Sequence, residues 1–174
     1  DAPIACVKAT NIANGKTCLV PAELVFLPAP RHLIKERLFG ATSNGLSSGN
    51  TLDEATLHGL SELIERDITS FYNLRDDSLL VDSATLPQNS AALREKIESS
   101  GLKLVVRYMP NTFGIPWFMA TLLDPEHPSP YFVNGGCGCH LDASIAMMRA
   151  ICEAAQSRLS YIHGGRDDLI QRYD

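Results

Sequence analysis

The first part of the chain shows the pattern of short β-strands. Two apolar-rich segments, Ile4–Ala9 and Thr17–Val20, flank the Asn-Gly dipeptide at 14–15. Asn-Gly tolerates positive φ at both turn positions, which favours a β-hairpin. The residues Glu23–Leu27 have the composition of a further strand. The pattern therefore predicts a hairpin followed by a third strand.

A helical period follows a polar loop, 42–50, that is rich in glycine and hydroxyl side chains. Thr51 and Glu54 have the spacing of a capping box, in which each end of the pair satisfies a backbone N–H of the first turn. Apolar residues then recur at helical spacing up to about Phe71, and these form the expected buried face: Leu52, Ala55, Leu60, Leu63 and Ile64.

The second half of the chain alternates strand and helix patterns. The expected strands are Leu79–Val81, Leu102–Met109, Pro116–Leu123 and Tyr131–Asn134, and a short helix is expected at Ala91–Ser99. Gly135–Gly138 reads as a tight turn. The cluster Cys137–His140 offers zinc ligands but lacks a second Cys/His pair, so the turn is the favoured interpretation.

The last predicted helix begins after Asp142 and runs to about Ile162. Its expected buried side consists of Met148, Cys152, Ala155, Leu159 and Ile162. Together the elements predict an α+β fold, with mixed or antiparallel sheets packed against two long helices.

Composition narrows the function classes. The chain has 174 residues, 45% of them apolar, and a formal net charge of −5. Without a global basic field, neither nucleic acid nor an anionic membrane surface is an expected partner. No apolar run approaches the roughly 20 residues of a membrane span. Five irregularly spaced cysteines argue against a secreted disulfide framework, so a soluble, cytoplasmic protein is expected.

One face of the first long helix is acidic. Glu54, His58, Glu62 and Glu65 fall within an arc of roughly 80° at helical spacing. Like charges so placed repel one another, and a hard divalent cation such as magnesium relieves that repulsion. A solvated surface face remains the alternative for this helix taken alone.

Two further features point toward phosphate. The loop 42–50 feeds a helix N-terminus, which presents backbone N–H groups to an anion. In the last helix, Arg149 and Glu153 share a stripe with Gln156 and Ser160. Arg149 could contact phosphate with Glu153 beside it, or the two could form a surface ion pair. Spacing alone leaves both readings open.

Two separated blocks of the sequence resemble the YcaO family. The first block comprises Ser43–Thr51, Glu54-Ala55 and His58–Asp67, and the second comprises Gly138–Asp142, Arg149-Ala150 and Glu153–Arg158. The resemblance extends from about Pro21 to Asp168. Among subgroups, the second block is most similar to the YcaO proteins that accompany TfuA.

The resemblance implies an ATP- and magnesium-dependent enzyme that phosphorylates peptide backbone amide oxygens, leading to azoline (cyclodehydration) or thioamide formation. It implies magnesium ligation by Glu54, Glu62 and Glu65, and phosphate contact by Ser47, Asn50, Arg66 and Arg149, with Glu153 in support. The implied partners are a peptide substrate, a TfuA-like or other protein, and a second copy in a homodimer.

The departures from the family pattern are informative. Family members are longer, and they carry an earlier helix with a Ser-x-x-Glu-x-x-Glu-Arg motif that supplies further metal ligands. Only one Glu-x-x-Glu-Arg occurs here, and Gly59 takes the place of the serine. We therefore expect residues 1–174 to be an incomplete domain, a central to C-terminal fragment of one YcaO-like ATP-binding domain, and inactive by itself. The alternative is a non-catalytic YcaO-like scaffold that binds peptide or docks a partner.

Overall fold

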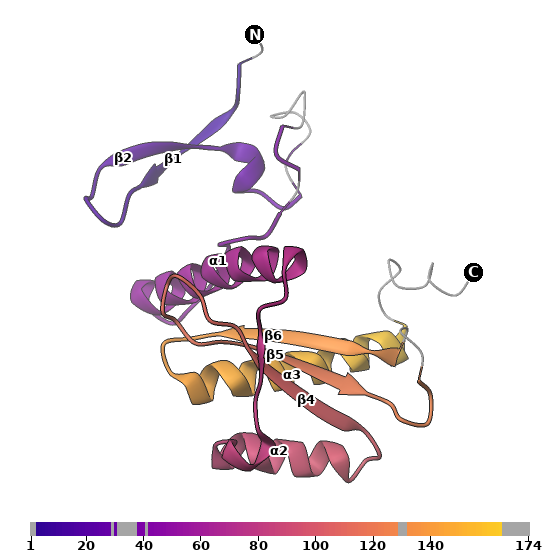
Figure 1. The fold of residues 1–174 in the computed structure, drawn as a ribbon. Helices are drawn as coiled ribbons and strands as arrows, with labels where there is room; N and C mark the ends of the chain where they lie inside the picture. The colour runs from indigo at the N-terminus through magenta and orange to yellow at the C-terminus, as the bar shows by residue number, and fades with distance from the viewer. Residues whose placement is uncertain (1–2, 29, 31–37, 41, 129–131, 165–174) are drawn as a thin grey trace. The chain divides into compact units, whose positions relative to one another are not determined.

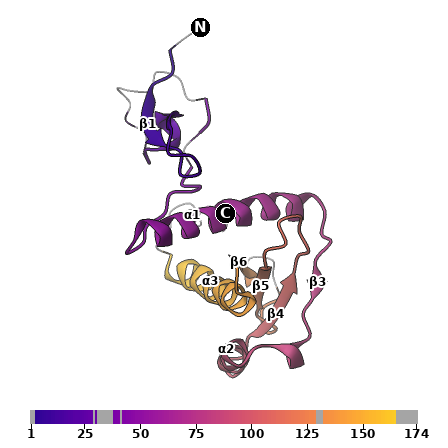
Figure 2. The same ribbon diagram turned by 90° about the vertical axis from the view of Figure 1, so that its left-hand side faces the viewer.

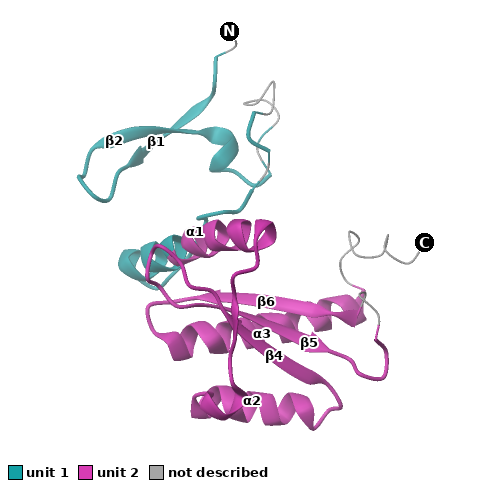
Figure 3. Ribbon diagram, viewed as in Figure 1, with its two compact units in different colours: residues 1–60 teal, residues 61–174 magenta. Residues whose placement is uncertain are grey.

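A computed structural model describes residues 3–28, 30, 38–40, 42–128 and 132–164. The chain divides into two compact units, residues 1–60 and 61–174 (Figure 3). Each unit is described by itself below. Their membership of one domain stays a prediction.

The first unit contains the predicted hairpin. Strands β1 (Cys6–Thr10) and β2 (Thr17–Pro21) pair antiparallel, with Thr10 opposite Thr17. The connecting loop is closed by the N–H of Asn11, which donates to the carbonyl of Lys16 at 2.8 Å. Only Gly15 in this loop has a positive φ, of 68°. The hairpin is confirmed, and one left-handed glycine is enough to reverse the chain.

The predicted third strand is wrong. Residues Ala22–Leu24 form a 3₁₀ turn, η1, in which Glu23 is only 5% exposed. The Glu23 carboxylate accepts hydrogen bonds from the backbone N–H groups of Leu38, Phe39 and Gly40, at 2.8, 3.2 and 3.0 Å. Three charge-assisted bonds offset the burial of this carboxylate. This long-range contact favours a turn over the strand that local composition suggested.

The second unit is built on one antiparallel sheet of four strands, β3 (Leu79–Leu80), β4 (Lys103–Tyr108), β5 (Trp117–Leu123) and β6 (Asn134–Cys139). The strands lie in the sheet in chain order, β3-β4-β5-β6. A 3₁₀ turn, η2 (Ser83–Thr85), and helix α2 (Gln88–Glu98) connect β3 to β4, and helix α3 (Ala143–His163) follows β6. The expected strand pair β4–β5 is confirmed.

The sheet of the second unit is covered on both faces (Figures 1 and 2). On one face, α3 and α2 pack against β4 and β5 around Leu122 and Ile151. Helix α1 spans Leu52–Leu74, and its second-unit part, from Ser61 on, lies on the other face, where Ile68 packs against Trp117 and Cys139. Full burial of an aliphatic side chain such as Ile151 contributes about 1.5–3 kcal/mol. The α+β class with antiparallel sheets is confirmed.

The glycine run 135–138 is a strand and not the predicted turn. It forms most of β6, and the predicted preceding strand residue Tyr131 lies outside the described residues. A Cβ added at Gly136 or Gly138 would collide with the backbone of α3. The glycines are therefore needed because strand and helix approach each other closely, and not because the backbone adopts a left-handed turn.

The buried side of α3 also differs from the prediction. The buried residues are Ala146, Met147, Ala150, Ile151 and Ala154. The expected residues Cys152, Ala155, Leu159 and Ile162 are exposed, and Met148 is half-buried. Because β6 approaches the helix through glycines, the contact requires alanines on α3, while Met147 and Ile151 pack elsewhere in the same core. Similarly, in the second-unit part of α1, Ile64 packs inward while the expected Leu63 is exposed.

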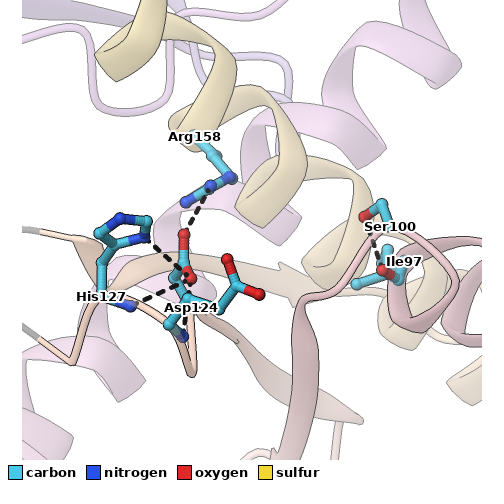
Figure 4. A network of polar contacts seen from close by, with 6 residues as sticks. Ile97, Ser100, Asp124, His127 and Arg158 are labelled. Carbon is cyan, nitrogen blue, oxygen red and sulfur yellow. Dashed lines mark hydrogen bonds and ion pairs between the residues drawn. The ribbon is translucent and has the colours of Figure 1, made fainter.

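A polar network ties α3 to the connection that follows β5 (Figure 4). Arg158 of α3 donates to the Asp124 carboxylate at 3.2 Å, and the His127 N–H donates to the same carboxyl group at 3.3 Å. Desolvation acts to raise the pKa of Asp124, but the hydrogen bonds from His127, Glu126 and Arg158 outweigh it and hold the pKa below its usual value. At the end of α2, the Ser100 hydroxyl donates to the carbonyl of Ile97.

No helix among the described residues has the length and apolar character needed to cross a bilayer.

Candidate functional site: two carboxylates on the edge of β6

Strand β6 is the last strand of the sheet, and two glutamates cover its outer edge. The N–H of Cys137 donates to Oε2 of Glu153 at 2.7 Å. The N–H of Cys139 donates to the carboxylate of Glu65. Alternate residues of a strand point their N–H groups to the same side, so the two bonds belong to one edge. Helices α1 and α3 thus each contribute one carboxylate to the same strand.

The charge of Glu153 lies close enough to Glu65 to perturb the Glu65 pKa. Burial, together with the negative charges of Glu153 and Glu62, raises the pKa of Glu65 to about 7, although Arg66 and the Cys139 N–H act in the opposite direction. This raised pKa indicates that the positive charges and hydrogen-bond donors around Glu65 do not fully offset its burial and the nearby negative charges. A cation placed among these oxygens would offset those charges.

The neighbouring thiols are not reactive groups. Burial is the largest cause that raises the pKa of Cys137 to about 12 and that of Cys139 to about 11, and the charge of Glu65 adds to both. Both thiols are therefore protonated at neutral pH and are poor nucleophiles. The chemistry of the β6 edge belongs to its carboxylates and backbone N–H groups.

Two arginines flank the carboxylates. Arg66 lies 3.6 Å from Glu62 in an ion pair one helical turn apart. Arg149 of α3 is exposed and lowers the pKa of Cys139, which places its charge near the end of β6. Within the described ranges Arg149 makes no ion pair with Glu153, whose Oε2 is engaged by β6. Of the two alternatives left open by spacing, the Arg149–Glu153 ion pair is therefore not formed. Phosphate contact by Arg149 stays a prediction.

The remaining candidates lie in the first unit. The Glu54 N–H donates to Oγ1 of Thr51 at 3.1 Å, which confirms the Thr51 half of the predicted capping box. Oε2 of Glu54 accepts from the N–H of Asn50 at 2.8 Å, one residue before the expected Thr51 N–H. The Ser47 hydroxyl donates to the carbonyl of Ala55 at 2.5 Å. The loop is held closely to the helix, since a Cβ at Gly59 would lie 2.8 Å from Oγ of Ser47.

The structure thus assembles five of the eight candidates around one strand edge: Glu62, Glu65, Arg66, Arg149 and Glu153. The other three lie around the start of α1, where Asn50 is hydrogen-bonded to Glu54 and Ser47 to the carbonyl of Ala55. Among the described residues no three His, Cys, Asp or Glu side chains are arranged to hold a metal ion by themselves. The roles of all eight residues stay predictions.

Sequence reasoning missed the backbone donors of Cys137 and Cys139. A backbone N–H carries no residue-type signal, and the glycine run was read as a turn. Alternation of glycine with small residues over 134–139, followed by a capped helix, was the available signal for a strand packed closely on that helix.

The architecture is shared with proteins of known structure. The YcaO protein of Methanopyrus kandleri bound with AMPPCP and Mg²⁺ matches 91% of this chain and 42% of that one, with a TM-score of 0.77 and 25% identity. A heterocyclase in complex with substrate and cofactor matches 87% of this chain and 20% of that one, with a TM-score of 0.74 and 28% identity. The fold is therefore the YcaO fold.

The chain belongs to the YcaO family. The family model described as YcaO cyclodehydratase, ATP- and Mg²⁺-binding, matches residues 1–173. A protein of Rhizobium leguminosarum bv. trifolii, described as an uncharacterized protein in the tfuA 3′ region, is 38% identical over 180 residues, covering 98% of this chain and 42% of that protein. The chain spans less than half the length of such curated relatives.

Proposed function

We propose that this chain is part of an ATP- and magnesium-dependent enzyme that activates peptide backbone amides by phosphorylation. The observation that carries the proposal is the pairing of Glu65 and Glu153 on the β6 edge, with the pKa of Glu65 raised to about 7 by burial and by its acidic neighbours. Membership of a family described as an ATP- and Mg²⁺-binding cyclodehydratase supports the same function.

The donor set fits magnesium. Carboxylate oxygens are the protein ligands that Mg²⁺ prefers, and Arg66 offsets only part of the negative charge around Glu65. We assign Glu54, Glu62 and Glu65 as the metal-holding residues. Magnesium bound there would supply charge neutralisation on the triphosphate and on the transferred phosphoryl group.

The other residues have distinct tasks. Arg66 and Arg149 provide positive charge for phosphate oxygens, and Ser47 and Asn50 present polar groups at the helix start. Glu153 acts as a positioning residue because its bond to the Cys137 N–H fixes α3, and with it Arg149, against β6. Whether the product is an azoline or a thioamide depends on the peptide and on any sulfur donor. The proposal includes both products.

The binding partners of the complete protein are also part of the proposal. A structure of a related heterocyclase contains substrate and cofactor, and a relative lies beside tfuA. We therefore propose a peptide substrate and a TfuA-like or other partner protein for the complete protein. A homodimer and a cytoplasmic location stay predictions.

The test replaces Glu65 or Glu62 with Gln in the complete protein and measures magnesium-dependent ATP hydrolysis. The expected result for Glu65→Gln and for Glu62→Gln is loss of hydrolysis with the circular dichroism spectrum unchanged, because Gln keeps the shape but removes the anionic ligand. The matched control is Glu95→Gln, an exposed glutamate on α2. Wild-type turnover in Glu65→Gln would place the metal site elsewhere.

A further inference from the structure

The second unit contains a pocket whose lining includes none of the β6 carboxylates. It has a volume of about 240 Å³ and lies between α1 and the connection from β4 to β5. Its lining includes Asp67, Ile68 and Phe71 of α1, and Met109, Asn111 and Phe113 of the connection. None of these residues has a part in the nucleotide site proposed above.

The floor and the rim of this pocket differ in exposure. Ile68 and Met109 are 3% and 7% exposed and form the apolar floor. Phe71 and Phe113 are 61% and 48% exposed and form part of the wall. Because these two aromatic side chains remain exposed next to an apolar pocket, their burial contributes little to the stability of the fold. A ligand that covers them would remove this apolar surface from water.

The pocket is preformed. The side-chain amide of Asn111 donates to the carbonyls of Met109 and Ile115, at 3.1 and 2.8 Å, and its Oδ1 accepts from the N–H of Phe113 at 3.1 Å. These three bonds fix the connection and the position of Phe113. A ligand would therefore find its site without first ordering the loop.

The charge of the pocket indicates the ligand. Asp67 is exposed and has no ion pair within the part of the chain that the structure describes. A carboxylate beside aromatic rings is suited to a long cationic side chain. Its methylene stem packs on the rings, its charge is attracted to their faces, and its head pairs with the carboxylate.

We propose that this pocket binds a basic side chain, arginine or lysine, of a peptide. The stem lies over the Ile68 and Met109 floor between Phe71 and Phe113, and the charged head pairs with Asp67. The inference goes beyond the proposed phosphorylation of amides and needs neither nucleotide nor metal. It identifies a recognition point for a basic residue in the peptide that the enzyme handles.

The test is a titration of the complete protein with capped peptides, in the absence of nucleotide. Binding is measured by saturation-transfer NMR. The probes are acetyl-Gly-X-Gly-amide, in which X is arginine, citrulline or norleucine. Citrulline keeps the shape of arginine without its charge, and norleucine keeps only an apolar stem. The arginine peptide is expected to bind about fivefold more tightly than the citrulline peptide.

The variants locate the effect. Asp67→Asn should weaken the arginine peptide about fivefold and remove its advantage over citrulline. Phe113→Ala should weaken both. The matched control, Glu126→Gln, changes an exposed carboxylate outside the pocket and should leave both affinities as they are. Because Asp67 is exposed, its replacement leaves the packed core untouched.

Three results would overturn the proposal: no binding of the arginine peptide, citrulline or norleucine peptides binding as well as arginine, or Asp67→Asn retaining the full arginine affinity. The titration contains no ATP, so its failure does not affect the proposed ATP-dependent activity. Conversely, Glu65→Gln tests ATP hydrolysis and does not touch this pocket.

Discussion

At the scale of single residues, Glu65 shows how burial and charge act together. Its carboxyl group is half-buried, lies near Glu153 and Glu62, and has its pKa raised to about 7. The Cys139 N–H and Arg66 offset only part of this effect. Near neutral pH the group is therefore divided between its neutral and charged forms, and binding of a cation would drive it to the charged form with release of a proton.

This pKa predicts a pH-dependent stability. The folded state binds the Glu65 proton more tightly than the unfolded state, whose pKa is near the ordinary 4.5. The stabilising effect is thus fully present below the unfolded pKa and is lost as the pH rises through about 7. Discounted for partial exposure, the loss is about 1 to 2 kcal/mol.

The measurement is urea unfolding at about pH 5 and about pH 8, without metal. The Glu65→Gln variant should lose this part of the pH dependence, and at the higher pH it should be more stable than wild type. Glu95→Gln serves as the control, because it removes a carboxylate from an exposed position. Equal pH profiles for wild type and Glu65→Gln would contradict the assignment.

Residue patterns found the acidic face but not its partners. Glu62 and Glu65 stand out because their spacing places them on one helical face. The neighbour that matters to Glu65, Glu153, is far away in sequence, and the bonds to the Cys137 and Cys139 N–H groups use backbone that no side chain reveals.

At the scale of elements, β6 and α3 approach each other too closely for a side chain to fit between them at Gly136 or Gly138. Gly136 and Gly138 face the backbone of α3, where Ala146, Ala150 and Ala154 are fully buried. Small residues on both elements let strand and helix approach each other. Because Glu153 and Arg149 are carried on the same helix, this contact also sets their distance from the β6 edge.

Gly138→Ala should destabilise the protein by about 2 to 3 kcal/mol, because the added Cβ would collide with the backbone of Ala146 and Ala150. The control is in the same strand. Gly135→Ala would bring its Cβ only to an ordinary contact of 3.5 Å with the Met119 side chain. Chemical denaturation of both variants measures the difference, and equal stabilities would show that α3 can move away at little cost.

Short stretches of sequence were sufficient to predict the elements that carry a turn or capping motif of their own. The hairpin, α1 with its Thr51–Glu54 cap and α3 with its Asp142 cap were predicted from short stretches. Strand β6 and turn η1 were not, because both depend on distant partners. The glycines of β6 are explained only by α3, and Glu23 of η1 is explained only by the N–H groups of residues 38–40.

At the scale of the whole molecule, the chain forms two compact units and covers less than half of its curated relatives. The five candidates at the β6 edge belong to the second unit, and Ser47, Asn50 and Glu54 belong to the first. In the described residues neither unit by itself holds a complete set of metal ligands.

We predict that the 174-residue chain alone binds Mg-ATP weakly or not at all. Glu65 and Glu153 repel each other, and the resemblance implies further ligands on an earlier helix. Calorimetric titration of the chain and of the complete protein measures the difference. Micromolar affinity of the chain alone would contradict the prediction and would show that its two units contain a sufficient site.

The same comparison separates the enzyme from the scaffold alternative. A scaffold would use the acidic residues as surface, and the complete protein would then bind peptide without hydrolysing ATP. The gathering of Glu62, Glu65, Arg66, Arg149 and Glu153 at one strand edge favours the enzyme, because a solvated face gives no reason for carboxylates of two helices to crowd together.

The amino-acid sequence by itself determined the α+β class, the long helices, the capping box and the acidic face, since these depend on periodicity and on contacts within a few residues. Only the tertiary structure decided that Gly135–Gly138 is a strand, that the alanines of α3 are its buried face, and that Glu153 meets Glu65. Each of these depends on which distant backbone comes close, and such distances are set by packing of the whole unit.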